Sequence, residues 1–349
     1  MVRVTILASG SKGNCAVVAT SKTRIMLDAG LSCREMVKRM RFAGEDPEEL
    51  DAILITHEHQ DHIQGLSVMA RRWNLPVFAT EATHAAWKRW MTPRRTMSFA
   101  AWLELRRQQQ STSSAAPGIG SEEASGVNVI DSQQGEDLTE GALELSAAAA
   151  ECDRAAEPSV AVAAEKEQAA EELFAPVSED PAYLPAVEYF RAGIAFEVGD
   201  IRVTPFTIPH DAVDPVGFVL EAEGLRIAVA TDLGYVPPNV RMHLLRADLL
   251  MIESNHDVEM LRDGPYPWAV KQRVMSRVGH LSNDAASEFL AKDYDDYARF
   301  VILAHISESN NLPELARMSA ERALADRMGL LANKVLLASQ TVPLESIYL

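Results

Sequence analysis

The stretch Thr56-His57-Glu58-His59-Gln60-Asp61-His62 contains three of the nine histidines of the chain and two acidic residues. It follows the apolar run Ile53-Leu54-Ile55, which predicts a buried strand over 51–56, and it leads into a helix predicted over 62–73. Imidazole nitrogens and carboxylate oxygens are ligands that zinc, manganese and iron accept in proteins. This density of ligands beside an apolar strand favours a metal site over the alternative, a solvated polar loop.

Four potential ligands in six residues are more than one metal ion usually takes from a single loop, so we predict two ions. Further ligands follow later apolar runs: His210 comes after a run ending at Phe206, Asp232 follows 228–231, and His305 follows 301–304. Polar side chains at strand ends converge on one rim of a layered fold. A lone histidine is more often structural, but together these three supply what the first stretch lacks.

The order of these motifs resembles the metallo-β-lactamase fold, with H-x-H-x-D-H at 57–62, a histidine after a strand, Thr-Asp at 231–232 and a late histidine. Asp28 matches the early structural aspartate of that superfamily. The chain is more closely similar to the YycJ/WalJ group of metallo-β-lactamase-fold exonucleases, in the stretches 7–14, 56–65, 208–212, 231–236, 253–257, 279–283 and 304–307. The resemblance implies an α/β (α+β) fold, a four-layer αββα sandwich of two sheets covered by helices.

The resemblance also implies roles for individual residues. One metal ion would take His57, His59 and His210, the other would take Asp61, His62 and His305, and Asp232 would bridge them. The ions would be zinc or manganese, with iron possible, and no nucleotide cofactor is implied. A hydroxide bridging the two ions would attack the phosphorus of a phosphodiester. The predicted catalytic residues are Asp61 and His280, which resembles the histidine that acts as a general acid in ribonuclease Z relatives.

Predicted substrate contacts include the turn at 10–14 and His256. The turn at 10–14 contains two glycines and would present backbone N–H groups to phosphate, although a tight hairpin is the alternative. His256 would either contact the substrate or shape its loop, and Asp211 would orient a neighbouring ligand histidine. His84 and His243 are expected at the surface or in packing. The complete set of predicted substrate contacts is Ser9, Ser11, Asn14, His256, Ser282 and Asn283.

Basic residues form two clusters near aromatic side chains. One contains Lys88, Arg89, Arg94 and Arg95, and the other contains Lys271, Arg273 and Arg277 near Trp268. Lysine and arginine groups that neutralise phosphates would favour a nucleic-acid ligand. Charged helix faces are common without such a ligand, so the clusters by themselves leave the choice open.

Residues 108–187 differ in composition from the rest of the chain. They hold 16 acidic and 2 basic residues, which account for 14 of the 17 net negative charges. Aromatic residues are almost absent, and such a segment buries too little apolar surface to offset the entropy of ordering it. We therefore predict a metallo-β-lactamase-fold domain formed by 1–107 and 186–349, interrupted by a disordered insertion over 108–185. Within it we expect a transient helix near 160–174. An inert low-complexity spacer is the default interpretation, and an acidic interaction arm is the alternative.

The apolar spacing in the two flanks predicts the secondary structure. Strands are expected at 2–8, 16–20, 24–28, 51–56, 76–79, 194–197, 200–206, 216–221, 225–230, 248–252, 300–304 and 335–337. Helices are expected at 33–43, 62–73, 81–91, 268–278, 284–292 and 313–328. Three scattered cysteines predict a reducing cytoplasm rather than a disulfide framework. We expect no membrane association, because no run approaches the roughly 18 apolar residues needed to span a bilayer.

The sequence is compatible with three functions. The first is a dinuclear-metal phosphodiesterase, by resemblance a 5′-to-3′ DNA exonuclease. The second is a hydrolase of the same fold that acts on a small phosphodiester, thioester or lactone. The third is a regulatory protein that retains the metal site without catalysis, and the complete ligand set counts against it. Because a redox di-iron version of the fold would carry Glu at the position of His59, the sequence favours hydrolysis.

Overall fold

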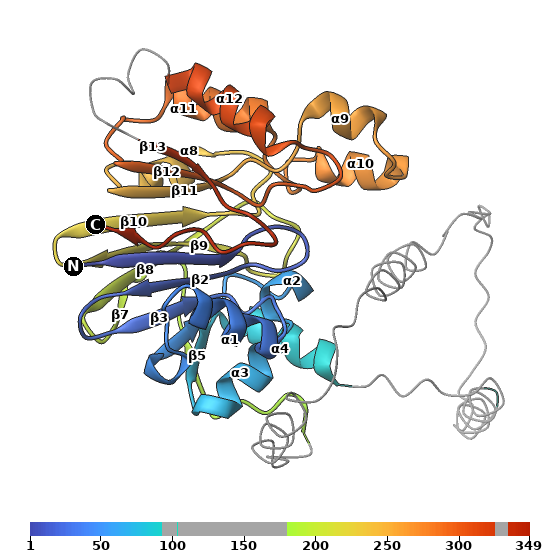
Figure 1. The fold of residues 1–349 in the computed structure, drawn as a ribbon. Coiled ribbons are helices and arrows are strands. Elements are labelled where there is room, and N and C mark those ends of the chain that lie inside the picture. Colours follow the sequence, from blue (N-terminus) through green and yellow to red (C-terminus); the bar gives the residue numbers. More distant parts are fainter. Residues whose placement is uncertain (93–102, 104–179, 325–333) are drawn as a thin grey trace, which may run out of the picture. The chain divides into compact units, whose positions relative to one another are not determined.

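Two seven-stranded sheets stacked face to face form the centre of the molecule, and helices cover their outer faces (Figure 1). The computed structural model describes residues 1–92, 103, 180–324 and 334–349. Among these residues, no helix is both long and apolar enough to cross a membrane. The two stacked sheets with helices on both outer faces confirm the predicted four-layer αββα sandwich.

The first sheet is mixed and has the strand order β14-β1-β2-β3-β4-β5-β6. The pairs from β14 to β3 are antiparallel, whereas the pairs from β3 to β6 are parallel. The bounds are β1 Arg3–Ala8, β2 Cys15–Ala19, β3 Arg24–Leu27, β4 Ala52–Leu54, β5 Pro76–Ala79, β6 Ala186–Tyr189 and β14 Ile347–Tyr348.

The second sheet has the order β13-β12-β11-β10-β9-β8-β7, with antiparallel pairs from β7 to β10 and parallel pairs from β10 to β13. Each sheet therefore begins as a meander and continues through helical crossovers. The bounds are β7 Phe196–Val198, β8 Ile201–Thr207, β9 Val216–Ala222, β10 Leu225–Ala230, β11 Leu249–Glu253, β12 Phe300–Ala304 and β13 Lys334–Leu337.

Helices of the first half cover the first sheet and those of the second half cover the second (Figure 1). In the first half they are α1 Cys33–Phe42, α2 Gln60–Ile63, α3 Leu66–Trp73 and α4 Glu81–Met91, with a 3-10 turn at Pro47–Glu49. In the second half they are α8 Pro238–Leu244, α9 Val258–Asp263, α10 Trp268–Val274, α11 Asn283–Lys292 and α12 Pro313–Leu324.

The central strands are apolar on both faces, because each face packs on a different layer. In β4, Ala52 and Leu54 belong to the cluster between the two sheets, whereas Ile53 belongs to the cluster under α1 and α3. A strand buried on both faces has a continuous apolar sequence rather than an alternating one. This is why Ala52-Ile53-Leu54 ends directly in the histidine-rich loop without an intervening polar residue on the strand.

The structure differs from the predicted elements at several points. The helix predicted over 62–73 is interrupted at Gly65, because Gly65 N donates to Ala29 O at 2.8 Å instead of to a carbonyl of α2, so two shorter helices form. The helix predicted over 268–278 ends at Val274, because the chain turns back and His280 N donates to Val274 O at 2.9 Å. β6, β14, α8 and α9 were not predicted.

Residues 180–185 fall within the predicted insertion 108–185. Residues 180–185 are described, and Ala182 and Leu184 are buried in the cluster under the first sheet, so the fold has already resumed there. The predicted helix near 160–174 lies outside the described residues, as do Arg94, Arg95 and residues 325–328 of the last predicted helix. The described residues on the two sides of the acidic segment, 1–92 and 180–349 apart from 325–333, belong to one compact unit.

Candidate metal centre

The histidine-rich loop connects β4 to α2, and a buried carboxylate of the preceding strand holds its start. Asp28 directly follows β3 and accepts hydrogen bonds from Thr56 N at 2.8 Å and from the Thr56 hydroxyl. Ala29 N donates to His62 O and Asn14 N donates to Asp61 O. These bonds tie three segments together, so the loop and the first turn of α2 present their side chains in the same direction.

Three histidines gather into a first group of potential ligands. In His57, His59 and His210, one nitrogen from each ring lies within 4.8 Å of those of the other two. Nδ1 of His59 and Nε2 of His210 lie 3.2 Å apart, and the planes of the two rings are inclined by 75°. His210 arrives from the segment after β8, so the group joins the two sheets.

A second group lies next to the first and contains Asp61, His62, Asp232 and His305, again within 4.8 Å. His62 Nε2 is 3.3 Å from Asp232 Oδ2, and His305 Nε2 is 3.6 Å from Asp61 Oδ2. The structure therefore brings together all seven side chains that the sequence predicted as ligands, in the two sets expected. Asp232 lies with the second set only, and its bridging role stays a prediction.

Hydrogen bonds at the outer nitrogens orient the imidazoles. Nδ1 donates to a carboxylate in His62 (Asp28, 2.8 Å) and His305 (Glu253, 2.7 Å), and to a backbone carbonyl in His210 (Gly279, 3.2 Å). Carboxylates and carbonyls only accept, so the proton sits on Nδ1 and the lone pair of Nε2 is left for a metal. The Thr56 hydroxyl, which donates to Asp28, accepts from His57 Nδ1 at 3.0 Å.

Buried atoms without a partner mark where a cation fits. Among the described residues, His57 Nε2, Asp232 Oδ2 and His305 Nε2 are buried and have no hydrogen bond. Leaving such a group unpaired costs about 1–3 kcal/mol. Each of the three atoms belongs to one of the two ligand groups, and histidine nitrogen with carboxylate oxygen is a donor set that suits divalent zinc or manganese. The residues present therefore fit a pair of such ions.

The charges of the second group are strongly coupled. Burial alone would lower the pKa of His62 and His305, but the carboxylate of Asp232 raises both pKa values well above their usual range. Burial opposes ionisation of Asp232, yet His305 and His62 hold its pKa well below the ordinary value. In His57, burial and the neighbouring His62 lower the pKa well below its ordinary value. Divalent cations would compete with protons for His62 and His305, so metal binding is expected to weaken as the pH falls.

Glu253 is the residue of this site that sequence reasoning missed. It ends β11, is fully buried, and accepts from Nδ1 of both His305 and His280, at 2.7 and 2.8 Å. Its other oxygen accepts from Leu233 N and Leu281 N. Although burial opposes ionisation, His280 lowers the pKa of Glu253 to about 2. The available signal was its position at the end of an apolar run, which Asp232 and His305 share.

His280 lies beside the second group with a fifth of its side chain exposed. Burial alone would lower its pKa, but Glu253 raises it above the ordinary value, so the ring retains a proton more readily. With Nδ1 held by Glu253, the other ring nitrogen is left for exchange of a proton with a substrate. This placement is compatible with the predicted general acid.

The predicted phosphate-binding turn is a tight hairpin instead. Gly13 N donates to Gly10 O, Lys12 N to Gln340, Gly10 N to the Asn14 side chain and Asn14 N to Asp61 O. These four amides are thus engaged within the protein. Their geometry does not support capture of a phosphate by the backbone of the turn.

The other predicted substrate contacts occupy different positions. Asn14 is close to the centre, with Nδ2 3.0 Å from His62 Nε2, and the Ser9 hydroxyl accepts from His305 N, whereas Ser11 is exposed. Ser282 caps α11 and Asn283 bonds to Ser254 and Asn311 inside the fold. Asn283 is 2% exposed, which does not support a contact with substrate.

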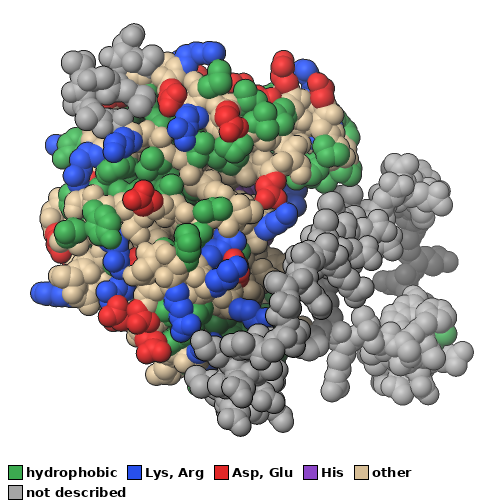
Figure 2. All heavy atoms as spheres, viewed as in Figure 1, with side chains coloured by type: hydrophobic (Ala, Val, Ile, Leu, Met, Phe, Trp, Pro, Cys, Tyr) green, Lys and Arg blue, Asp and Glu red, His purple; other side chains and the backbone are tan. Residues whose placement is uncertain are grey.

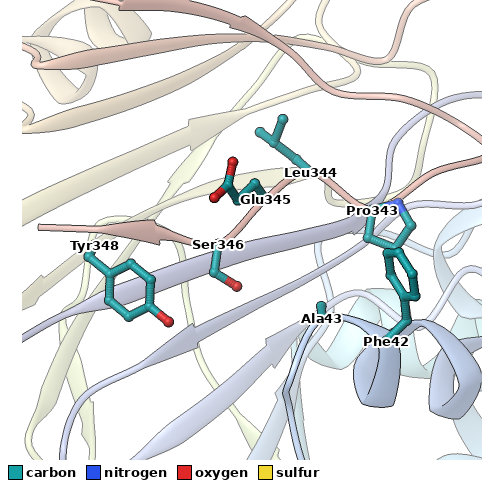
Figure 3. Close-up of a pocket in the computed structure, with 7 residues that line it drawn as sticks. All are labelled: Phe42, Ala43, Pro343, Leu344, Glu345, Ser346 and Tyr348. Carbon is teal, nitrogen blue, oxygen red and sulfur yellow. The ribbon is translucent and has the colours of Figure 1, made fainter.

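The remaining histidines and the cavity of Figure 3 lie outside the ligand groups. His256 is buried and bridges to Ser282, His243 stacks on Phe206, and His84 bonds to Tyr189. A cavity of about 370 Å³ lies between the end of α1 and the C-terminal segment (Figure 3). No ligand-group residue is among those lining it: Phe42, Ala43, Pro343, Leu344, Glu345, Ser346 and Tyr348.

Comparisons with known proteins agree with this architecture. Residues 8–145 match the family model of the metallo-beta-lactamase superfamily, and residues 95–306 match the beta-lactamase superfamily domain. The exodeoxyribonuclease YycJ of Bacillus anthracis is 30% identical, covering 92% of this chain and 89% of the relative. The exodeoxyribonuclease WalJ of Streptococcus pneumoniae is 29% identical, covering 93% and 88%.

A solved structure shows the same fold. The metallo-beta-lactamase fold protein YhfI from Bacillus subtilis has a TM-score of 0.54 at 12% identity and covers 98% of both chains. Since a family model spans more than half of the chain and a 30% identical relative spans nearly all of it, the chain belongs to the metallo-beta-lactamase superfamily, as a metal-dependent hydrolase similar to the YycJ/WalJ group.

Proposed function

We propose that the chain is a two-metal phosphodiesterase that degrades DNA from the 5′ end, as a 5′-to-3′ exonuclease. The observation that carries the proposal is the pair of adjoining ligand groups built from His57, His59 and His210 and from Asp61, His62, Asp232 and His305. The names of the two curated relatives support DNA as the substrate. The free, buried Cys15 and Cys33 support the proposed cytoplasmic location.

Each part of the site has a task in this reaction. Two divalent ions, when bound, neutralise the charge of the phosphodiester and lower the pKa of a water toward about 7. The outer hydrogen bonds that the ligand imidazoles donate to Asp28, Glu253 and Gly279 keep these rings in position without rearrangement. His280, held by Glu253, donates its proton to the departing oxygen. Asp61 and Asp232 supply the negative charge that balances the ions.

The first test compares substrates. The purified chain with Mn²⁺ or Zn²⁺ is incubated with duplex DNA labelled at the 5′ or the 3′ end and, separately, with bis-p-nitrophenyl phosphate. We expect early release of the 5′ label as mononucleotide and slower loss of the 3′ label. Hydrolysis of the small diester with intact DNA would favour a small-molecule hydrolase, and early release of the 3′ label would overturn the polarity.

The second test removes one ligand. His59→Ala takes a nitrogen from the first group, and we expect DNA degradation to fall at least about a hundredfold together with metal content. His243→Gln is the control, because His243 stacks on Phe206 and belongs to neither ligand group. Undiminished turnover in metal-loaded His59→Ala would exclude the proposed metal chemistry for both kinds of substrate.

A further inference from the structure

The segment from α10 to His280 is fastened to the metal centre along its length. Gly279 O accepts from His210 Nδ1, and His280 N donates to Val274 O. A Cβ on Gly279 would lie 2.2 Å from Arg273 O, so the loop lies directly on the end of the helix. Side chains at the end of α10 and in this loop therefore keep a defined position relative to the first ligand group.

Arg273 places a cation beside that group. Its Nε donates to Asp211 Oδ2, and the other oxygen of Asp211 is 3.5 Å from His210 Nε2. The Arg273 side chain is 63% exposed, and its two terminal nitrogens make no hydrogen bond with the described residues. A guanidinium held by one nitrogen, with the others facing solvent, is pre-arranged for a phosphate oxygen.

The guanidinium plane of Arg277, four residues after Arg273, provides a flat surface. Its guanidinium lies 4.2 Å from the centre of the Tyr235 ring, and the Arg277 side chain is exposed. A Cβ on Gly234 would lie 2.4 Å from the Arg277 backbone, so the two segments are in contact. Tyr235 is three residues after Asp232 and Arg277 is three before His280, so their Cα atoms lie within roughly 10 Å of the Cα atoms of these two residues.

Lys271, the third basic residue of this cluster, has a structural role. It is buried, and its Nζ donates to the carbonyl oxygens of Arg262 and Gly264 at 2.7 and 2.8 Å. Elsewhere, on the face seen in Figure 2, Lys and Arg side chains are mingled with Asp and Glu. Recognition of a polyanion near α10 therefore depends on individually placed arginines rather than on a broad basic field.

We propose that Arg273 and Arg277 form a nucleotide subsite next to the metal centre, in which Arg273 binds the phosphate adjoining the scissile one and Arg277, backed by Tyr235, stacks on the base. Arginine planes stack on unpaired bases, so the arrangement suits an unpaired terminal nucleotide, either in a single strand or at the opened end of a duplex. This inference rests on the proposed nuclease function and names the part of the substrate that the metal centre itself does not contact.

The phosphate contact is tested by salt dependence. KM and kcat of the metal-loaded chain are measured on a single-stranded oligonucleotide over a series of salt concentrations. For Arg273→Ala we expect KM to rise about tenfold and the slope of log KM against log salt to fall by about 0.7, the value for one phosphate contact on a single strand. Arg202→Ala is the matched control, since Arg202 is 60% exposed and lies at the start of β8, whereas His210 follows the end of that strand. A raised KM with an unchanged slope would assign Arg273 a purely structural role.

The stacking contact is tested by removing the base. Arg277→Lys keeps the charge but loses the plane, and we expect KM to rise about fivefold to tenfold on an intact oligonucleotide. On an oligonucleotide whose terminal nucleotide lacks its base, wild type and Arg277→Lys should have equal KM values. Tyr235→Leu, which removes the backing ring, should behave in the same way as Arg277→Lys.

The outcomes separate this inference from the function on which it rests. If wild type degrades DNA while Arg273→Ala and Arg277→Lys match the Arg202→Ala control, the subsite is wrong and the nuclease function stands. The same holds if Arg277→Lys raises KM equally with and without the terminal base. If wild type fails to degrade any oligonucleotide yet hydrolyses bis-p-nitrophenyl phosphate, the nuclease function itself is wrong.

Discussion

At the scale of single residues, Glu253 connects the proposed general acid to the second ligand group. One oxygen accepts from two imidazoles and the other accepts from two backbone amides. All four partners are donors, and only a carboxylate accepts on both of its oxygens. An amide at this position would turn a donor toward at least one of these pairs.

Glu253→Gln is therefore expected to weaken metal binding although its size is unchanged. Loss of a group that orients ligand histidines typically lowers metal affinity 10–100-fold. Titration of the metal-free protein with Zn²⁺ or Mn²⁺, followed by calorimetry, measures the effect. Glu221→Gln, an exposed carboxylate on β9, serves as the control. Equal metal affinities in wild type and Glu253→Gln would show that Glu253 does not orient the ligand histidines.

His256 makes a separate contribution to the stability of the fold, and this contribution depends on pH. Burial lowers its pKa to about 4, and its Nδ1 has no hydrogen-bond partner among the described residues. Between that value and an ordinary pKa near 6.5, the unfolded chain takes up a proton that the folded chain does not. Acidification through this window therefore favours unfolding.

We expect the metal-free wild type to lose about 2 kcal/mol more stability between pH 7 and pH 5 than His256→Gln does. Urea unfolding of both proteins in the presence of a chelator, at the two pH values, measures the difference. The variant shares every metal ligand with wild type, so their common pH dependence cancels. Parallel losses in both proteins would show that His256 titrates normally in the fold.

At the scale of elements, the ends of strands bear unusual backbone conformations. Asp28, Asp232 and His305 follow β3, β10 and β12, and their φ angles are 57°, 60° and 53°. Such left-handed conformations of residues other than glycine cost about 1–3 kcal/mol each and persist only where surrounding contacts determine them. Here the carboxylates and imidazoles of the site face inward as a result of these turns.

Gly30 shows how closely the connecting segments approach. A Cβ at this position would lie 1.7 Å from the carbonyl oxygen of Asp61, and backbone cannot move aside as a flexible side chain can. We expect Gly30→Ala to displace the start of α2, to lower the free energy of unfolding by about 3 kcal/mol and to reduce metal content. Chemical unfolding and metal analysis measure the two effects.

Gly193→Ala is the control for that substitution. A Cβ on Gly193 would meet no atom within 4 Å, and its φ of 83° alone predicts a loss of about 1 kcal/mol without any effect on metal binding. If Gly30→Ala retained its metal and its stability, the backbone at Gly30 and at Asp61 would have to move apart without disturbing the fold.

At the scale of the whole molecule, the acidic segment interrupts the chain between two parallel neighbours of one sheet. β5 ends at Ala79 and β6 begins at Ala186, yet the two strands pair residue by residue. Ala182 and Leu184, just before β6, are buried with the first sheet. The folded unit therefore includes these residues, and the removable segment ends before them.

Two deletions test where the unit resumes. Replacing 108–176 by a Gly/Ser linker is expected to preserve solubility, thermal stability and metal content. Replacing 108–185 also removes Leu184, and we expect a further loss of about 2–5 kcal/mol. Thermal unfolding and metal analysis of both proteins provide the comparison. Insoluble protein from the shorter deletion would contradict the division of the chain into these parts.

Apolar runs such as 52–54 were enough to predict strands buried on two faces, and the polar residues directly after them predicted the rim of the fold, because both patterns are local. The four-layer sandwich and the roles of individual ligands were predicted from the resemblance to the metallo-β-lactamase fold. The predicted sandwich is confirmed, and the seven predicted ligands lie in two adjoining groups. Their binding of metal stays a prediction to be tested.

Tertiary structure alone decided which nitrogen of each histidine faces the centre, that Glu253 holds two of them, and that Asn283 serves the fold. It also decided that β6 follows directly on Leu184, whereas composition placed 180–185 in the insertion. Hydrogen-bond partners such as Glu253 and His305 are separated by about fifty residues. Periodicity and composition report on neighbours along the chain, so they carry no information about contacts that form only when distant segments pack together.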